Sequence, residues 1–259
     1  EANQDQPLTA VPVLVKFSGP LRRGAGNFSL ADLPLELLAL LTPVPAGLRG
    51  RLSMQGRYRL GTPQPELALN ISLVDGYLGE TALVLERGTI QLEQARLLVD
   101  LSLRAAGASS SVELAGVVPL DSGQQGLELR LASRDDGLRF LVGLAQPALE
   151  WNQGSGDLQL LVRGSVSQPI ANGFLRFRGA QLQFIGQKVR DVDATVLFDF
   201  EQLLLQEFNA KVGDKGVLRG QGSLGLFRPE ATADGKDATL KVELEKVPFA
   251  MPRIKAVAD

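Results

Sequence analysis

Apolar and polar residues alternate with a period of two along most of the chain. One run carries Leu67, Leu69, Ile71 and Leu73 at every second position, with mostly polar residues between them. This period places alternate side chains on opposite faces of a β-strand. Many similar runs follow one another, so the pattern predicts an all-β fold: a long antiparallel meander with one apolar face and one polar face.

Glycine-containing dipeptides interrupt these runs. Five of them are of the kind that commonly forms tight turns: Asp75-Gly76, Arg87-Gly88, Gly123-Gln124, Gly186-Gln187 and Gly213-Asp214. We therefore expect the chain to reverse direction at these positions.

Two leucine-rich segments, about 33–41 and 136–145, break the period and predict short helices. In the first, Asp32 is a candidate N-cap and Pro34 lies in the first turn, where proline is tolerated. In the second, the Asp135-Asp136 pair precedes the helix at the positive end of its dipole. We expect both helices to cap or plug the apolar sheet face. Partner-binding or membrane-surface helices are the alternative.

The two helical segments introduce an internal repeat. Pro65 and Pro169 lie 104 positions apart, as do Gly116 and Gly220. The spacing predicts two groove-forming repeats at 31–134 and 135–246, each led by a short helix. Residues 1–30 would end a preceding repeat and 247–259 would begin a further one, so we expect the chain to be a piece of a longer protein.

The composition narrows the function. The chain has no Cys and no His, which excludes a Cys/His zinc site, a thiol nucleophile, a Ser-His-Asp triad and disulfides. The net charge of −2 argues against nucleic-acid binding. We expect no catalytic residues, no metal and no cofactor, and a binding or structural role.

Two motifs allow another interpretation. Asp191 and Asp193 could form a paired-acid glycosidase site, but exposed aspartates on the polar face of a strand are much commoner. The run Gly220–Gly225 matches G-x-G-x-x-G, which in a nucleotide-binding fold must follow a strand and open a helix. The residues after it continue a strand pattern, so we interpret these glycines as strand glycines that permit a bend.

The strands supply far more apolar surface than two short helices can cover. A repeated meander can curl into a trough whose inside remains apolar, and so large an apolar surface implies a ligand or partner. A lipid tail suits it, because each buried CH₂ contributes about 0.8 kcal/mol without needing a hydrogen bond.

Several segments resemble repeats of the TamB family: 32–38 with 47–52 in the first copy, and 156–160 with 163–175 in the second. The family pattern is roughly G-x-L-x-l-x-v-x-G-T/S, a short gap, a proline, then G-x-L. Ser165 stands where Thr is commoner, and Glu66 replaces the usual Gly.

The resemblance implies a fold and a setting. TamB-like proteins form a long β-sheet folded like a taco with an apolar interior, are anchored in the inner membrane and cross the periplasm. They are implicated in moving phospholipids to the outer membrane and in assembling outer-membrane proteins with a TamA-type barrel. Related proteins in cyanobacteria and plastids are linked to outer-envelope biogenesis and protein import. The family carries no catalytic residues, so none is transferred.

The sequence therefore predicts a periplasmic lipid conduit whose partners are phospholipid acyl chains and, through other parts of the protein, a TamA-type barrel. The alternative is a scaffold whose sheet edges template outer-membrane strands by β-augmentation. The residues expected to line the groove are Leu67, Leu69, Ile71, Leu73, Leu97, Val99, Leu101, Leu158, Leu160, Val162, Val196 and Phe198.

Overall fold

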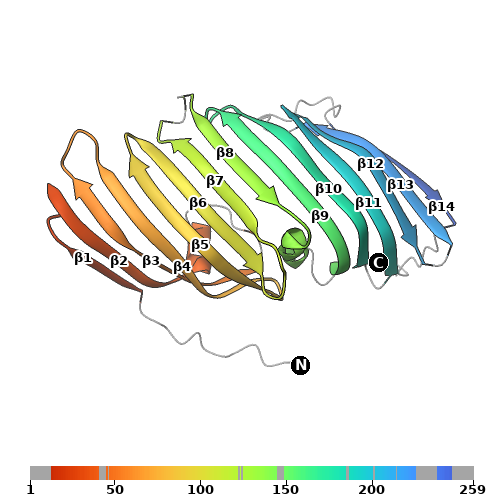
Figure 1. Ribbon diagram of the computed structural model, residues 1–259, viewed down its shortest axis with the longest axis horizontal. Helices are drawn as coiled ribbons and strands as arrows, with labels where there is room; N and C mark the ends of the chain where they lie inside the picture. Colours follow the sequence, from red (N-terminus) through yellow and green to blue (C-terminus); the bar gives the residue numbers. More distant parts are fainter. Residues whose placement is uncertain are drawn as a thin grey trace, which may run out of the picture.

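The computed structural model describes residues 13–40, 45, 47–121, 123, 125–144, 149–184, 187–200, 202–213, 215–225 and 238–246. Within these ranges the chain forms one fourteen-stranded antiparallel sheet whose strand order follows the sequence (Figure 1). The elements are β1 (Leu14–Ser18), β2 (Gly24–Pro34), η1 (Leu35–Leu40), β3 (Leu48–Leu60), β4 (Glu66–Leu78), β5 (Thr81–Glu93), β6 (Arg96–Ala105), β7 (Val112–Pro119), β8 (Leu127–Ser133), η2 (Gly137–Leu144), β9 (Leu149–Gly164), β10 (Pro169–Phe184), β11 (Gln187–Phe200), β12 (Gln202–Val212), β13 (Gly216–Gly225) and β14 (Ala238–Glu245).

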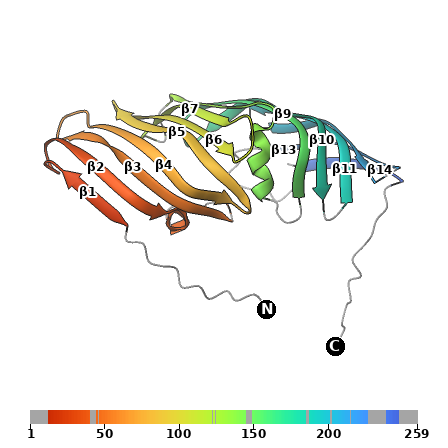
Figure 2. The same cartoon turned by 60° about the horizontal axis from the view of Figure 1, so that its bottom comes forward.

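The predicted all-β antiparallel meander is confirmed, and the sheet is open. It arches along its length, with β1 and β14 as its two edges (Figure 2). Both η1 and η2 lie at the open side of the arch, where the ends of the strands form a rim.

The pairing register aligns apolar positions into rows that cross many strands. Leu69 on β4 lies opposite Gly56 on β3 and Ile90 on β5, and Ile90 lies opposite Val99 on β6. We call the face that carries Leu69 and the rows aligned with it the inner face, and the opposite face the outer face. One inner row runs through Phe17, Phe28, Gly56, Leu69, Ile90, Val99, Gly116, Leu129, Val162, Ala171 and Phe200.

Two of the five predicted turns are wrong. Asp75-Gly76 lies inside β4 and Arg87-Gly88 inside β5, where each accompanies a shift in register with a neighbouring strand. Asp75 has a φ of 52°, so its left-handed conformation makes a local irregularity in the strand instead of a reversal. The chain turns instead between β4 and β5 at Gly79, whose φ is 59°. Gly213 follows β12 and Gly123 lies between β7 and β8, as predicted, whereas Gly186 lies outside the described residues.

Both predicted helices exist, but they are 3₁₀-helices and the first begins later than expected. Asp32 and Pro34 are the end of β2, so the prediction that they start the helix is wrong. The N–H of Asp32 donates to Ser53 Oγ on β3 at 3.2 Å, which holds the segment in the sheet. The predicted helix ends, 41 and 145, lie outside the described residues.

The order of elements recurs along the chain. A strand, a 3₁₀-helix and five further strands occur first from β2 to β7 and again from β8 to β13. The residue boundaries predicted for the repeats stay predictions, and residues 1–12 and 247–259 lie outside the described ranges.

Candidate functional site

All twelve residues predicted to line the groove fall on the inner face. Leu67 and Leu97 share a row through Leu92, while Val99 and Val162 share the row of Leu69. Leu101, Leu160 and Phe198 form the next row, and Leu158 and Val196 the row after that. Ile71 and Leu73 continue the alternation of β4 opposite Met54 and Leu52.

These side chains are mostly half-buried. Leu69 is 9% exposed and Leu158 is 7% exposed, whereas the other ten fall between the buried and exposed classes. Neighbours within the sheet shield them from the sides, but the described residues contain one sheet only, so no second sheet covers the face. The result is an apolar trough, defined as the arched inner face from β1 to β14.

The trough has further lining that the sequence reasoning missed. Phe17, Phe28 and Tyr58 cluster on β1–β3, with ring centroids 5.2 Å apart for Phe17–Phe28 and 6.2 Å apart for Phe17–Tyr58. The ring of Tyr58 reaches across Gly26, where any side chain would clash with its hydroxyl. Gly26 and Gly56 interrupt the alternation of apolar residues in β2 and β3, so the alternation did not predict this part of the lining. An aromatic residue opposite a strand glycine is the sequence signal that could have predicted it.

A second group, on the C-terminal half, involves the helix η2. Leu138 of η2 is 1% exposed and forms a buried cluster with Val112 and Leu158. Phe140 and Leu141 of η2 also pack against this cluster. Its partly buried sheet members are Leu131, Leu160, Leu175, Phe177 and Phe198. Three predicted lining residues, Leu158, Leu160 and Phe198, therefore belong to a packed cluster beside η2, while others lie on uncovered parts of the trough.

Charged residues pair across strands on the outer face. Arg87 Nε lies 2.8 Å from Asp100 Oδ1, and the same arginine reaches Glu113 at 4.0 Å. Arg51 pairs with Asp75, and Arg59 with Glu66 at 3.4 Å. These pairs are solvent-exposed, so they contribute little stability individually. Together they give the outer face a mixed, polar character opposite the apolar trough.

The two aspartates considered for glycoside hydrolysis take part in this outer-face pattern. The hydrogen bond and positive charge of Lys211, whose Nζ lies 2.8 Å from Asp191 Oδ2, hold the pKa of Asp191 below its ordinary value. Asp193 Oδ1 accepts the N–H of Gly179 at 3.0 Å. A glycosidase general acid needs a raised pKa, so Asp191 does not suit that role.

The G-x-G-x-x-G run does not have the context of a nucleotide site. All of Gly220–Gly225 lies within β13, which confirms the strand interpretation. A side chain at Gly222 would clash with the backbone oxygen of Thr239 on β14, so the glycine permits close pairing of these strands.

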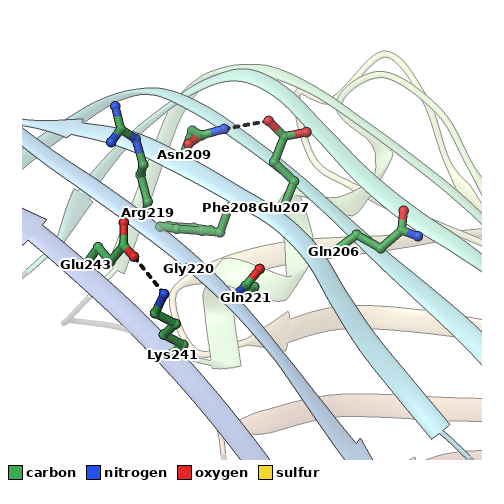
Figure 3. Close-up of a pocket in the computed structure, with 9 residues that line it drawn as sticks. All are labelled: Gln206, Glu207, Phe208, Asn209, Arg219, Gly220, Gln221, Lys241 and Glu243. Atoms are coloured by element: carbon green, nitrogen blue, oxygen red, sulfur yellow. Dashed lines mark hydrogen bonds and ion pairs between the residues drawn. The ribbon is translucent and has the colours of Figure 1, made fainter.

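A small hollow of about 220 Å³ lies beside this run (Figure 3). It sits where the β12–β13 register shifts between Leu205 and Phe208. Four of its polar residues pair with one another: Asn209 Nδ2 donates to Glu207 Oε1 at 2.6 Å, and Lys241 Nζ pairs with Glu243 Oε1 at 2.9 Å. The apolar trough is therefore the stronger candidate site. In the described part of the chain, no helix combines the length and apolar character needed to cross a membrane.

Comparison with known proteins gives partial matches to plant proteins. Protein TIC236, chloroplastic, from Arabidopsis thaliana is 29% identical over 130 residues, which is 49% of this chain and 6% of the relative. Protein SUBSTANDARD STARCH GRAIN 4, chloroplastic, from Oryza sativa subsp. japonica is 28% identical over 105 residues, 40% of this chain and 5% of the relative. No family model and no solved structure matches the chain. The chain is thus similar, at modest identity, to short stretches of two chloroplastic proteins, which agrees with the plastid branch of the TamB-like resemblance.

Proposed function

We propose that this chain is a segment of a bridge-like lipid-transfer protein, and that its trough shields phospholipid acyl chains as they cross an aqueous gap between two membranes. The observation that carries the proposal is the aligned inner face: apolar rows run across the strands of a single sheet, and no second sheet formed by the described residues lies over them. A soluble protein rarely leaves so large an apolar surface without a ligand or partner.

The dimensions of the trough suit an acyl chain. Fourteen strands spaced about 4.8 Å apart give a trough roughly 60 Å long. Each buried CH₂ of a lipid tail contributes about 0.8 kcal/mol, and the tail needs no hydrogen bonds from the lining. Binding and transfer in this proposal use shape and apolar surface alone, without catalysis, cofactor or nucleic acid.

The proposed setting is the space between two envelope membranes. The two relatives are chloroplastic, which supports a plastid envelope space, and the TamB resemblance supports its bacterial equivalent, the periplasm. An inner-membrane anchor and contact with a TamA-type barrel would belong to other parts of the full protein.

Two matched pairs of substitutions test the proposal. Leu69→Asp and Val196→Asp place a charge on the inner face, whereas Asn70→Asp and Thr195→Asp place the same charge on the adjacent outer-face positions. We expect the inner-face variants to lose co-purifying phospholipid in native mass spectrometry and the outer-face variants to retain it. Equal lipid content in all four variants would contradict the assignment of the trough.

The second candidate is a scaffold for β-strand assembly. Every residue of β14 is exposed, and among the described strands it pairs with β13 alone, so one of its edges is available for β-augmentation. A photo-crosslinker in β14 that captures an unfolded outer-membrane β-strand, together with no lipid crosslinks from Leu69 or Val196, would favour this function over the conduit.

A further inference from the structure

The rim of the sheet has a notch at β7 and β8. Strand β8 pairs with β9 only from Gly164 to Leu158, and its pairing ends at Ser133. Strand β9 continues to Leu149 and pairs there with β10 alone among the described strands. On the other side of the notch, β7 pairs with β6 only as far as Leu103. The first half of β9 therefore presents a strand edge to the notch.

The helix η2 occupies this notch. It contacts β9 on one side and β4, β5 and β6 on the other, and Figure 2 shows it between the ends of β6 and β9. The N–H of Gly156, on the edge of β9, donates to the carbonyl oxygen of Asp135 at 2.6 Å. The ten residues from Asp135 to Leu144 thus fill the place where β7 and β8, if they were longer, would continue the trough wall.

The apolar side chains of η2 occupy lining that is continuous with the uncovered trough. Leu158, beneath Leu138, lies in the same inner row as Leu175, Val196 and Leu205. Leucine and phenylalanine side chains offer this row the same kind of contact as an acyl chain. An acyl chain that reached this part of the row would therefore compete directly with η2.

Besides its apolar packing and the Gly156–Asp135 hydrogen bond, η2 is held at its start by one side-chain contact. The carboxylate of Asp136 accepts the N–H of Ser109 at 3.0 and 2.9 Å to its two oxygens, the Ser109 hydroxyl at 2.9 Å and the N–H of Ser110 at 3.0 Å. These donors lie in the connection between β6 and β7. A 3₁₀-helix has weaker hydrogen-bond geometry than an α-helix, so η2 itself is a poor source of rigidity.

We infer that η2 is a displaceable part of the trough wall, latched by Asp136, that yields to an acyl chain and so regulates passage through the middle of the trough. This inference rests on the proposed lipid function. When η2 lies in the notch, Leu138 covers Leu158, and Phe177 packs against the same cluster. When η2 is displaced, Leu158 and Phe177 are open to lipid.

Opening of η2 and access of lipid beneath it can be measured separately in the whole chain. Hydrogen exchange at the Gly156 N–H reports opening of η2 without any lipid. The single tryptophan, Trp151, lies on the first half of β9 with its ring 5.4 Å from that of Phe177. Its fluorescence therefore reports a brominated acyl chain that reaches the region beneath η2.

The test compares the unchanged chain with Asp136→Ala and with a control variant, Asp135→Asn. The side chain of Asp135 is exposed, and asparagine tolerates the left-handed backbone that Asp135 adopts. We expect the Gly156 N–H to exchange its hydrogen faster than the backbone N–H groups of β10. Asp136→Ala should raise the exchange rate of the Gly156 N–H about tenfold further, because it removes a charged hydrogen-bonded contact. Quenching of Trp151 by vesicles of dibrominated phosphatidylcholine should also increase in Asp136→Ala. Asp135→Asn should behave like the unchanged chain, and circular dichroism should show the same sheet in all three proteins.

Four outcomes would overturn the inference. If Gly156 exchanges as slowly as the β10 amides in both the unchanged chain and Asp136→Ala, η2 is a fixed wall. If exchange accelerates but quenching is equal in the two proteins, η2 opens without regulating lipid access. If no quenching occurs while native mass spectrometry still finds bound lipid, the regulatory role fails and the proposed function stands; if no lipid is bound at all, both fail.

Discussion

Gly116 on β7 lies opposite Leu129 on β8, and any side chain at Gly116 would clash with the backbone carbonyl oxygen of Glu128, the residue before Leu129. Gly173 on β10 stands in the same relation to Gln159 and Leu160 on β9. The φ angles of the two glycines are 152° and 151°, a region that disfavours other residues. The inner face therefore needs glycine at these two positions, where the backbone of the neighbouring strand leaves no room for a Cβ atom.

Gly116→Ala should destabilise the sheet by about 2–4 kcal/mol, because it combines an unfavourable φ with a backbone clash. Gly107→Ala is the matched control: its φ is 80°, but an added Cβ would meet nothing within 4 Å. The control should cost only about 1 kcal/mol. Urea denaturation of both variants measures the difference, and equal losses of stability would contradict the close-approach explanation.

Replacement of Tyr58 by phenylalanine should leave stability unchanged or raise it by about 1 kcal/mol. The Tyr58 hydroxyl is buried and has no hydrogen-bond partner among the described residues, so its removal relieves a desolvation cost. The ring contacts with Phe17 and the cover over Gly26 are retained.

Tyr77→Phe is the control for Tyr58→Phe, because Tyr77 is 36% exposed on the outer face and its hydroxyl can reach water. Thermal unfolding compares the two variants. A loss of more than about 1 kcal/mol in Tyr58→Phe would show that the hydroxyl does make a stabilising hydrogen bond.

The period-two pattern predicted the all-β sheet and the face on which many of its apolar residues lie. Leu67, Leu69, Ile71 and Leu73 share the inner face with Leu158 and Val196, although these lie on distant strands. The alternation works because successive side chains of a strand point to opposite faces of the sheet. In a single sheet, one face can therefore be apolar throughout while the other is polar and faces water.

Long-range pairing explains what the pattern could not predict. Asp75-Gly76 has the composition of a turn, but the pairing of β4 with β3 and β5 keeps it inside a strand. The placement of η2 depends on the ends of β7 and β8, at Val112 and Ser133, and nothing local in the sequence marks these as a notch. The anchor between Asp136 and Ser109 joins residues 27 positions apart, beyond the range of any local motif.

Leu138→Ala should destabilise the protein by about 2–4 kcal/mol, since Leu138 is 1% exposed within a packed cluster. Leu240→Ala on β14 is the comparison, because Leu240 is 70% exposed on the edge strand and its truncation should cost well under 1 kcal/mol. Chemical denaturation measures both values. If the two losses are similar, η2 does not pack on the sheet as described.

Acid should loosen η2 before the sheet itself unfolds. Burial raises the pKa of Asp136, but the hydrogen bonds from the N–H and hydroxyl of Ser109 and the N–H of Ser110 outweigh it and hold this pKa below its ordinary value. Because the folded pKa is depressed, the contact stabilises η2 fully above the unfolded pKa of about 4, and the stabilisation is lost as pH falls through the folded value. We therefore expect Trp151 emission to be constant from pH 7 to about 5 and to change below about pH 4. Asp136→Asn should remove this transition and leave the emission at pH 7 close to its acid-state value, whereas a transition of the same size in Asp136→Asn would assign it to other carboxylates.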